Sequence, residues 1–215
     1  MLKKYNYLNL LLFIPFGFGL YVAINDGIIL GFERGVFDAL RNLAPFADIP
    51  MRALTELGSA VGVIAITALI FLITLIFNKR FFEFGLPVTI VAIISRVINI
   101  TIKNSLMRER PAFKVLNASE SSFPSGHSQN NMALYIAILI TLLLIVNSPK
   151  IRMWLKIGCI ALPIIIGITR LYFGVHYFTD VIAGWSLGAV VAYNLLYFYF
   201  KIYRRITEKN DGNKS

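Results

Sequence analysis

The chain consists mainly of apolar runs that are separated by short polar segments. Six runs of 19 or 20 residues occupy positions 7–25, 58–77, 84–102, 127–146, 155–173 and 181–200. An α-helix of about this length crosses the hydrocarbon core of a bilayer. The first run follows two lysines, as in a signal peptide, but no clear cleavage site comes after it, so we interpret it as a retained helix. The pattern predicts an all-α integral membrane protein, a six-transmembrane-helix bundle that forms a single domain over residues 1–215.

Residues 26–57 have a different pattern, in which acidic and basic residues alternate with apolar ones. Apolar side chains such as Phe37 and Leu40 recur at roughly helical spacing against this polar background. The pattern predicts one amphipathic helix that lies at the membrane interface and is broken at Pro45 and Pro50. We interpret this segment as a connector between the first and second spans, with a substrate-gating role as the alternative.

The composition supports a membrane protein and argues against a nucleic-acid-binding one. Hydrophobic residues make up 57% of the chain and the mean hydropathy is +0.71, both high for a soluble domain. The net charge is +10, but the basic residues form short clusters between apolar runs rather than one continuous groove. The only cysteine, Cys159, lies in an apolar run and is expected to be a small buried hydrophobic residue.

The distribution of lysine and arginine predicts the orientation of the bundle. Six spans place both termini on one side, and twelve of the twenty-one basic residues then share that side: Lys3, Lys4, Lys79, Arg80, Lys150, Arg152, Lys156, Lys201, Arg204, Arg205, Lys209 and Lys214. Cytoplasmic loops carry an excess of basic residues, so we expect cytoplasmic termini in the cell membrane. The opposite, extracytoplasmic face then carries the most unusual polar residues of the chain.

Three polar clusters lie at the ends of the predicted spans on this outer face. Their members are Lys103, Arg110 and Pro111, then Pro124, Ser125, Gly126 and His127, and then Arg170, His176 and Asp180. Both histidines of the chain belong to these clusters. Ionisable residues are costly near hydrocarbon and usually mark a functional path, so the clusters predict one shared site.

The residue types suit a phosphate ester. Lys103, Arg110 and Arg170 can neutralise phosphate oxygens. Ser125 can cap the fourth span, while Gly126 lets a ligand approach the backbone N–H groups at the positive end of the helix dipole. The sequence therefore predicts a phosphate-binding site formed by these five residues.

The two histidines provide a nucleophile and an acid. His176 and Asp180 are four residues apart, so the carboxylate can accept the imidazole Nδ1–H if the turn between them is helical. One histidine can attack phosphorus through Nε2 while the other protonates the departing alkoxide. Two histidines and an aspartate could also bind zinc, but three cations directed at the same place would repel a metal ion, so we expect none.

These motifs, Lys-x6-Arg-Pro, Pro-Ser-Gly-His and Arg-x5-His-x3-Asp in this order, resemble the signatures of the type 2 phosphatidic acid phosphatase and vanadium haloperoxidase superfamily. One departure is Thr169 before Arg170, where the family usually has serine, but a hydroxyl is retained. The resemblance implies a six-helix membrane lipid phosphatase without a metal or other cofactor. It also implies catalytic roles for His176 as nucleophile, Asp180 as its orienting partner and His127 as general acid, with phosphate held by Lys103, Arg110, Ser125, Gly126, His127 and Arg170.

The sequence leaves the substrate open. Undecaprenyl pyrophosphate, phosphatidylglycerol phosphate and phosphatidate all fit an outward-facing site with lipid access, and the oligomeric state is undetermined. A haloperoxidase shares the site but is normally soluble. A lipid-phosphate-binding or transport protein of the same fold without activity is a further alternative, although every motif position is filled here.

Other charged residues near the motifs are expected to have no catalytic role. We interpret Arg108, Glu109 and Lys114 as a solvated loop surface. Arg96 shares a helix face with Lys103 but lies deeper. For this arginine we expect a structural partner, such as Asn99 or a backbone carbonyl.

Overall fold

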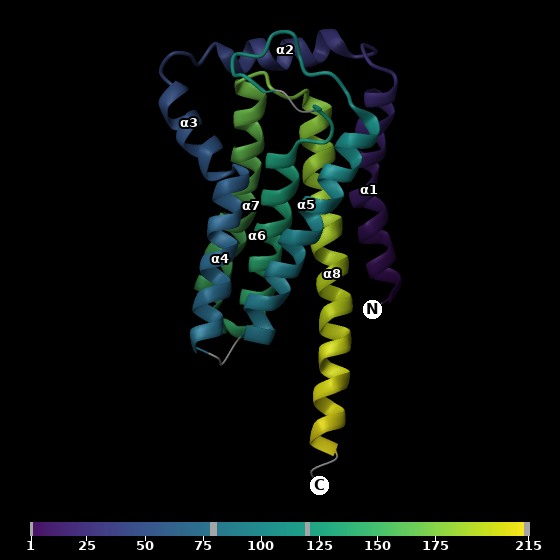
Figure 1. The fold of residues 1–215 in the computed structure, drawn as a ribbon, viewed down its shortest axis with the longest axis vertical. Coiled ribbons are helices and arrows are strands. Elements are labelled where there is room, and N and C mark those ends of the chain that lie inside the picture. The colour runs from purple at the N-terminus through teal and green to yellow at the C-terminus, as the bar shows by residue number, and fades with distance from the viewer. Residues whose placement is uncertain (1, 78–80, 119–120, 213–215) are drawn as a thin grey trace.

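The protein is a helical bundle in which two short helices cover one end (Figure 1). The structure is a computed structural model that describes residues 2–77, 81–118 and 121–212. All regular structure in these ranges is helical. The elements are α1 (Leu2–Ile24), α2 (Leu30–Arg41), α3 (Asp48–Leu57), α4 (Ala60–Phe77), a π-helical turn η1 (Phe81–Gly85), α5 (Leu86–Leu106), α6 (Gly126–Ile145), α7 (Pro149–Tyr172) and α8 (Phe178–Gly212).

Four helical stretches are long and apolar enough to cross a membrane: Phe81–Leu106, Gly126–Ile145, Pro149–Tyr172 and Phe178–Glu208. A fifth is possible if α3 and α4, which meet at a 51° bend, form one broken span. The described apolar part of α1, Asn9–Ile24, is shorter. Within the described residues, length and composition thus support four or five spans, compared with the six predicted from the sequence.

Residues 26–57 form two helices, so the prediction of a single helix broken at two prolines is wrong in part. In Figure 1, α2 lies across the end of the bundle and α3 leads from it to α4. Pro45 lies between the two helices, as predicted. Pro50, however, lies in the first turn of α3, where the N–H that proline lacks has no helical partner in any case. The side chains of Glu33 and Phe37 on α2 are buried, so this segment covers the bundle end.

Helix α6 lies at the centre of the bundle and packs closely on α8. A Cβ atom added to Gly188 would lie 2.3 Å from the backbone oxygen of Gln129, and one added to Gly184 would lie 2.8 Å from that of Ser125. Small residues four apart allow two membrane helices to approach this closely. The approach also brings the helix ends together, since the backbone N–H of Ser125 donates to the carbonyl of Asp180 at 3.1 Å.

A buried polar network fixes α6 against α5. The side chain of Gln129 accepts a 2.8 Å hydrogen bond from Asn99 and donates a 3.0 Å bond to the carbonyl of Ser95, whose hydroxyl donates to Asn130 at 3.0 Å. Buried polar groups of this kind specify one arrangement, because an unpaired group would be costly. The network therefore sets the register between the two helices that carry Lys103 and the first turn of α6.

Candidate active site

The predicted motif residues meet at a cavity of about 220 Å³ near the covered end of the bundle. Its lining comes from α4, α5, α6, α7 and the segments that connect them: Gly58, Ala60, Val63, Arg96, Lys103, Arg110, Gly126, His127, Asn130, Arg170 and His176. Six of the eight predicted site residues thus share one cavity. The other two, Ser125 and Asp180, are fully buried and do not belong to the lining.

His176 lies in the short link between α7 and α8 and is only 3% exposed. Burial lowers the pKa of its imidazole to about 3, although Asp180 opposes this shift, so the ring is neutral near pH 7. Nη1 of Arg110 lies 3.3 Å from Nε2 of His176 and donates a 2.7 Å hydrogen bond to the carbonyl of Val175. Because a guanidinium can only donate, Nε2 presents its lone pair to this side, where the cations of the cavity lie.

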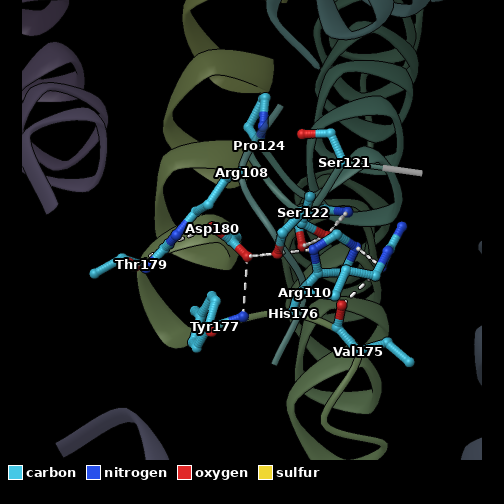
Figure 2. Close-up of polar contacts among 12 residues, drawn as sticks. Arg108, Arg110, Ser121, Ser122, Pro124, Val175, His176, Tyr177, Thr179 and Asp180 are labelled. Atoms are coloured by element: carbon cyan, nitrogen blue, oxygen red, sulfur yellow. Dashed lines mark hydrogen bonds and ion pairs between the residues drawn. The ribbon is translucent and has the colours of Figure 1, made fainter. Parts of the chain in front are cut away.

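Asp180 lies in the first turn of α8, on the other side of the imidazole. Its Oδ2 is 3.4 Å from Nδ1 of His176, an ion-pair distance that is longer than a normal hydrogen bond. The same oxygen accepts a 2.9 Å bond from the backbone N–H of Tyr177 and a bond from the hydroxyl of Ser122 (Figure 2). The carboxylate is therefore held in place by groups other than the histidine that it faces.

Arg108 provides a further contact to Asp180, and the prediction that it belongs to a solvated loop surface is wrong. Its side chain is buried, and Nη1 donates to Oδ1 of Asp180 at 2.7 Å and to the hydroxyl of Thr179 at 3.1 Å. Figure 2 shows Arg108 reaching Asp180 from one side, while His176 and Arg110 lie on the other. Glu109 and Lys114 are exposed, in agreement with the prediction.

The Arg108 guanidinium also joins the active site to the covering segment. Nη2 donates a 2.8 Å hydrogen bond to Asp26 and lies 3.6 Å from a carboxylate oxygen of Glu33, and the guanidinium carbon is 4.0 Å from the ring centroid of Tyr177. Burial disfavours the charge on Arg108, but the carboxylates of Asp180, Asp26 and Glu33 together outweigh this effect and raise the pKa of the guanidinium. Burial raises the pKa of Glu33. One cation thus lies among three carboxyl groups.

One local signal could have identified Arg108. Helix α5 ends at Leu106, and Met107 follows with a left-handed backbone (φ 46°). A residue that precedes proline favours an extended backbone, and this applies to Arg110 before Pro111. In an extended segment, side chains two residues apart share a face, so Arg108 and Arg110 are expected to point in the same direction. Both side chains indeed reach the 175–180 segment.

Lys103 and Arg170 are the other predicted phosphate ligands in the cavity. The ammonium group of Lys103 is buried and donates to the carbonyl of Ser121. Nη1 of Arg170 donates a 2.5 Å bond to the hydroxyl of Thr55, while its Nε is buried and makes no hydrogen bond within the described residues. This N–H can therefore be satisfied by an anion in the cavity.

Ser125 and Gly126 form the start of α6. The Ser125 hydroxyl accepts bonds from the backbone N–H (3.4 Å) and the hydroxyl (2.9 Å) of Ser128, so this residue is the predicted N-cap. Its side chain is fully buried and lies outside the cavity lining. Gly126 lines the cavity, and a Cβ atom there would lie 3.0 Å from Oδ1 of Asn99. The backbone N–H groups of this helix start can act on an anion, whereas the Ser125 hydroxyl accepts from Ser128 and lies outside the cavity lining.

Two other expectations concern partners and metals. The prediction that Arg96 has a structural partner, such as Asn99 or a backbone carbonyl, is wrong. The Asn99 amide donates to Gln129 and to the carbonyl of Pro124, and Arg96 makes no hydrogen bond within the described residues. Across the described residues, no group of three or more His, Cys, Asp or Glu side chains could hold a metal ion.

The chain is similar in sequence to known proteins. Residues 60–204 match the PAP2 superfamily. The chain is 32% identical over 164 residues to phosphatidylglycerophosphatase B of Bacillus subtilis (strain 168), with 74% of this chain and 79% of the relative covered. It is 31% identical over 204 residues to an undecaprenyl-diphosphatase of Sulfolobus acidocaldarius, with 90% of each covered.

Two solved structures share the fold. One is a transmembrane PAP2-type phosphatidylglycerolphosphate phosphatase from Bacillus subtilis, with a TM-score of 0.80, 28% identity, and coverage of 91% of this chain and 98% of that one. The other is LpxE of Aquifex aeolicus, with a TM-score of 0.61, 23% identity, and coverage of 80% and 97%.

Proposed function

Because the chain belongs to the PAP2 superfamily, we propose that it is a membrane lipid phosphatase that hydrolyses a phosphomonoester or diphosphate of a lipid. The two relatives with more than 30% identity are named as enzymes that act on phosphatidylglycerophosphate and on undecaprenyl diphosphate. A phosphorylated lipid of either kind suits a cavity of this charge at the end of an apolar bundle. Candidate substrates are therefore phosphatidylglycerol phosphate, undecaprenyl pyrophosphate and phosphatidate.

One observation carries the proposal, namely the orientation of His176. Its Nε2 faces Arg110 at 3.3 Å inside a cavity that Lys103 and Arg170 also line, and Asp180 lies behind its Nδ1. A neutral imidazole with its lone pair directed at an anion-binding cavity is arranged as a nucleophile toward phosphorus. The cations stabilise the charge that develops on the phosphoryl oxygens.

The proposed reaction has two steps. Nε2 of His176 attacks phosphorus while the bond from phosphorus to the lipid oxygen breaks, and His127 gives a proton to that oxygen. A water molecule then attacks the phosphohistidine, His127 takes a proton from the water, and the Nε2–P bond breaks to release phosphate. Asp180 stabilises the positive charge that develops on the His176 ring during the attack.

The hydrogen bonds around Nε2 and Nδ1 must change during this reaction. Arg110 donates toward Nε2, so its guanidinium has to turn to a phosphate oxygen when this lone pair attacks phosphorus. The 3.4 Å gap between His176 and Asp180 is expected to shorten as the ring gains charge, since catalytic hydrogen bonds are often long without substrate.

We further propose the membrane placement that the charge distribution predicts. The bundle has six spans, α1 and the α3–α4 pair included, with α2 at the outer interface, cytoplasmic termini and the site on the extracytoplasmic side. In Figure 1, the start of α1 and the last turns of α8 lie toward the same end, opposite α2. This arrangement supports the proposal, because it separates the basic ends of the chain from the cavity.

A substrate panel tests the proposed function. The purified full-length protein, in mixed micelles, is assayed for phosphate release from lipid monophosphates and lipid diphosphates, beside a His176→Ala variant. We expect release from at least one lipid class with the unmodified chain and none with the variant. A folded protein that releases phosphate from no phosphorylated lipid, or a variant that is equally active, would overturn the proposal.

A further inference from the structure

Arg96 is a cation that the proposed reaction does not use, although it lies at the junction of three hollows. It lines the catalytic cavity, a polar hollow of about 790 Å³ near the end of α5, and an apolar groove of about 490 Å³ between α4 and α5. It precedes Lys103 by seven residues and so lies about 10 Å further along the α5 axis. The side chain is therefore placed between the reacting centre and an apolar channel.

The guanidinium of Arg96 has no hydrogen bond or ion pair within the part of the chain that the structure describes. By contrast, Arg170 donates to Thr55, and Arg110 donates to a backbone carbonyl. An arginine at this depth in a membrane bundle is costly unless it is paired, and such residues usually mark a substrate path. Arg96 is thus available to an anion that enters the cavity.

The position of Arg96 relative to His127 indicates which part of a substrate it would meet. Its Nη1 lies 3.8 Å from the point that a Cβ atom on Gly126 would occupy, at the start of the helix where His127 follows. His127 is the proposed acid for the leaving oxygen. Arg96 therefore lies beside the helix start that carries the proposed acid for the leaving group.

The groove beyond Arg96 fits a hydrocarbon chain. It runs between α4 and α5 and is lined by apolar side chains that include Ile64, Ala68, Ile93 and Val97. A lipid whose tail lies in this groove and whose phosphorus meets His176 must pass the Arg96 guanidinium in between.

We infer that Arg96 binds a second phosphate group of the substrate, on the tail side of the bond that is cleaved. The inference rests on the proposed function and narrows its substrate class. When a lipid diphosphate is attacked at its terminal phosphorus, the P–O bond breaks toward the bridging oxygen, and the leaving group is a lipid monophosphate. Arg96 neutralises the charge that this group gains, through the two-pronged contact that guanidinium makes with phosphate.

Phosphatidylglycerol phosphate could also supply a second phosphate group for Arg96, because its phosphodiester lies one glycerol unit away from the terminal phosphate. Lipids that carry only one phosphate, such as phosphatidate or a prenyl monophosphate, lack this second phosphate group. Arg96 accordingly determines preference between these substrates and adds little to the reaction of the phosphoryl group itself.

The test compares kcat/KM of the full-length protein and its Arg96→Gln variant on four substrates. These are a prenyl diphosphate, the prenyl monophosphate of the same chain, phosphatidylglycerol phosphate and phosphatidate. We expect a loss of about 10- to 100-fold on a substrate with two phosphates, the range for losing a hydrogen bond to a charged group. The single-phosphate substrates should change by less than about threefold. Arg96→Lys keeps the charge and should recover part of the loss, and Arg205→Gln, an exposed arginine near the other end of the bundle, is the matched control.

The four substrates separate the outcomes. If only the prenyl diphosphate loses activity, Arg96 binds the phosphate that is bonded directly to the terminal one. If phosphatidylglycerol phosphate loses activity equally, Arg96 also binds a phosphodiester one glycerol unit away. Equal losses on all four substrates, or no loss on any, would overturn the inference while the proposed function stands. If the unmodified protein is inactive on all four, the proposed function fails first.

Discussion

The Arg108 guanidinium donates a 2.7 Å hydrogen bond to Oδ1 of Asp180, with 2% and 0% of the two side chains exposed. The other oxygen of the same carboxylate faces Nδ1 of the candidate nucleophile His176 at 3.4 Å. Arg108 therefore holds Asp180 from the side away from the reaction. We therefore expect it to be a positioning residue, which acts through Asp180 rather than on the phosphate.

Arg108→Gln is expected to lower both stability and rate. It removes the cation that neutralises Asp180 and Glu33, and breaking a buried ion pair costs about 3–5 kcal/mol in the free energy of unfolding. Loss of a charged hydrogen bond, about 1.5–3 kcal/mol, corresponds to about a 10- to 100-fold slower attack by His176. The measurements are urea unfolding in micelles and single-turnover kinetics.

Two variants separate these effects. Arg34→Gln removes an exposed pair with Asp38 and should change stability by less than about 1 kcal/mol. Glu33→Gln combined with Arg108→Gln removes a buried acid together with the cation, so stability should partly return while the rate stays low. If the rate returns together with stability, Arg108 is structural only.

The two histidines are expected to fail differently. His176→Ala should abolish turnover and the phosphoenzyme, whereas His127→Ala should slow phosphoenzyme formation by about 10²–10⁴-fold for an alkoxide leaving group. The loss should be smaller for a lipid diphosphate. Its leaving group is a lipid monophosphate, which depends less on protonation than an alkoxide does. Rapid mixing with ³²P-labelled substrate and an alkaline quench, which preserves phosphohistidine, measures both. A phosphoenzyme that persists in His176→Ala but is absent in His127→Ala would reverse the assigned roles.

His176 is expected to stay neutral in mildly acidic solution. Burial lowers its pKa to about 3, whereas a histidine of the unfolded chain titrates near 6.5. The unfolded state thus binds more protons, so this residue reduces stability as the pH falls below 6.5 toward 3 and has no effect above 6.5. The chain has two histidines, so His127→Gln leaves His176 alone for ¹⁵N NMR between pH 8 and 5. A titration midpoint near 6.5 would contradict the predicted neutral ring.

The orientation of the bundle can be tested by cysteine labelling in a Cys159→Ala background. Ala112→Cys lies on the exposed loop beside the active site, and Lys150→Cys lies at the start of α7 near the opposite end. A membrane-impermeant maleimide should label Ala112→Cys in intact cells and Lys150→Cys only after lysis. The reverse result would place the active site in the cytoplasm.

The groove between α4 and α5 is expected to hold the lipid tail, with entry sideways from the bilayer. Ala68→Phe places an aromatic ring in the groove, while Ala65→Phe adds the same ring to an exposed position of α4 outside it. Ala68→Phe should lower kcat/KM for a long-chain lipid by about tenfold, roughly the value of two buried CH₂ groups. A water-soluble short-chain phosphate should be unaffected. Equal effects of the two variants would show that the tail lies elsewhere.

The sequence alone determined the helical membrane class and most of the cavity lining. Long apolar runs can satisfy their backbone groups in lipid only as helices, so this part of the fold follows from local composition. The motifs lie at helix ends. Because consecutive spans run in opposite directions, the end of one span and the start of the next lie on the same face. The cavity is therefore lined by Lys103, Arg110, His127, Arg170 and His176.

Only the tertiary structure decided the contacts between distant segments. Arg108 is buried because it binds Asp26 and Asp180, which are 82 and 72 residues away in the sequence. A local sequence pattern cannot predict contacts between residues so far apart. The Ser125 hydroxyl accepts from Ser128, and Asn99 pairs with Gln129 instead of Arg96, for the same reason. Several polar groups could pair with each partner, and helix packing selects among them. The close approach of α6 to α5 and α8 decides which donors and acceptors meet. It also leaves Arg96 facing the cavity.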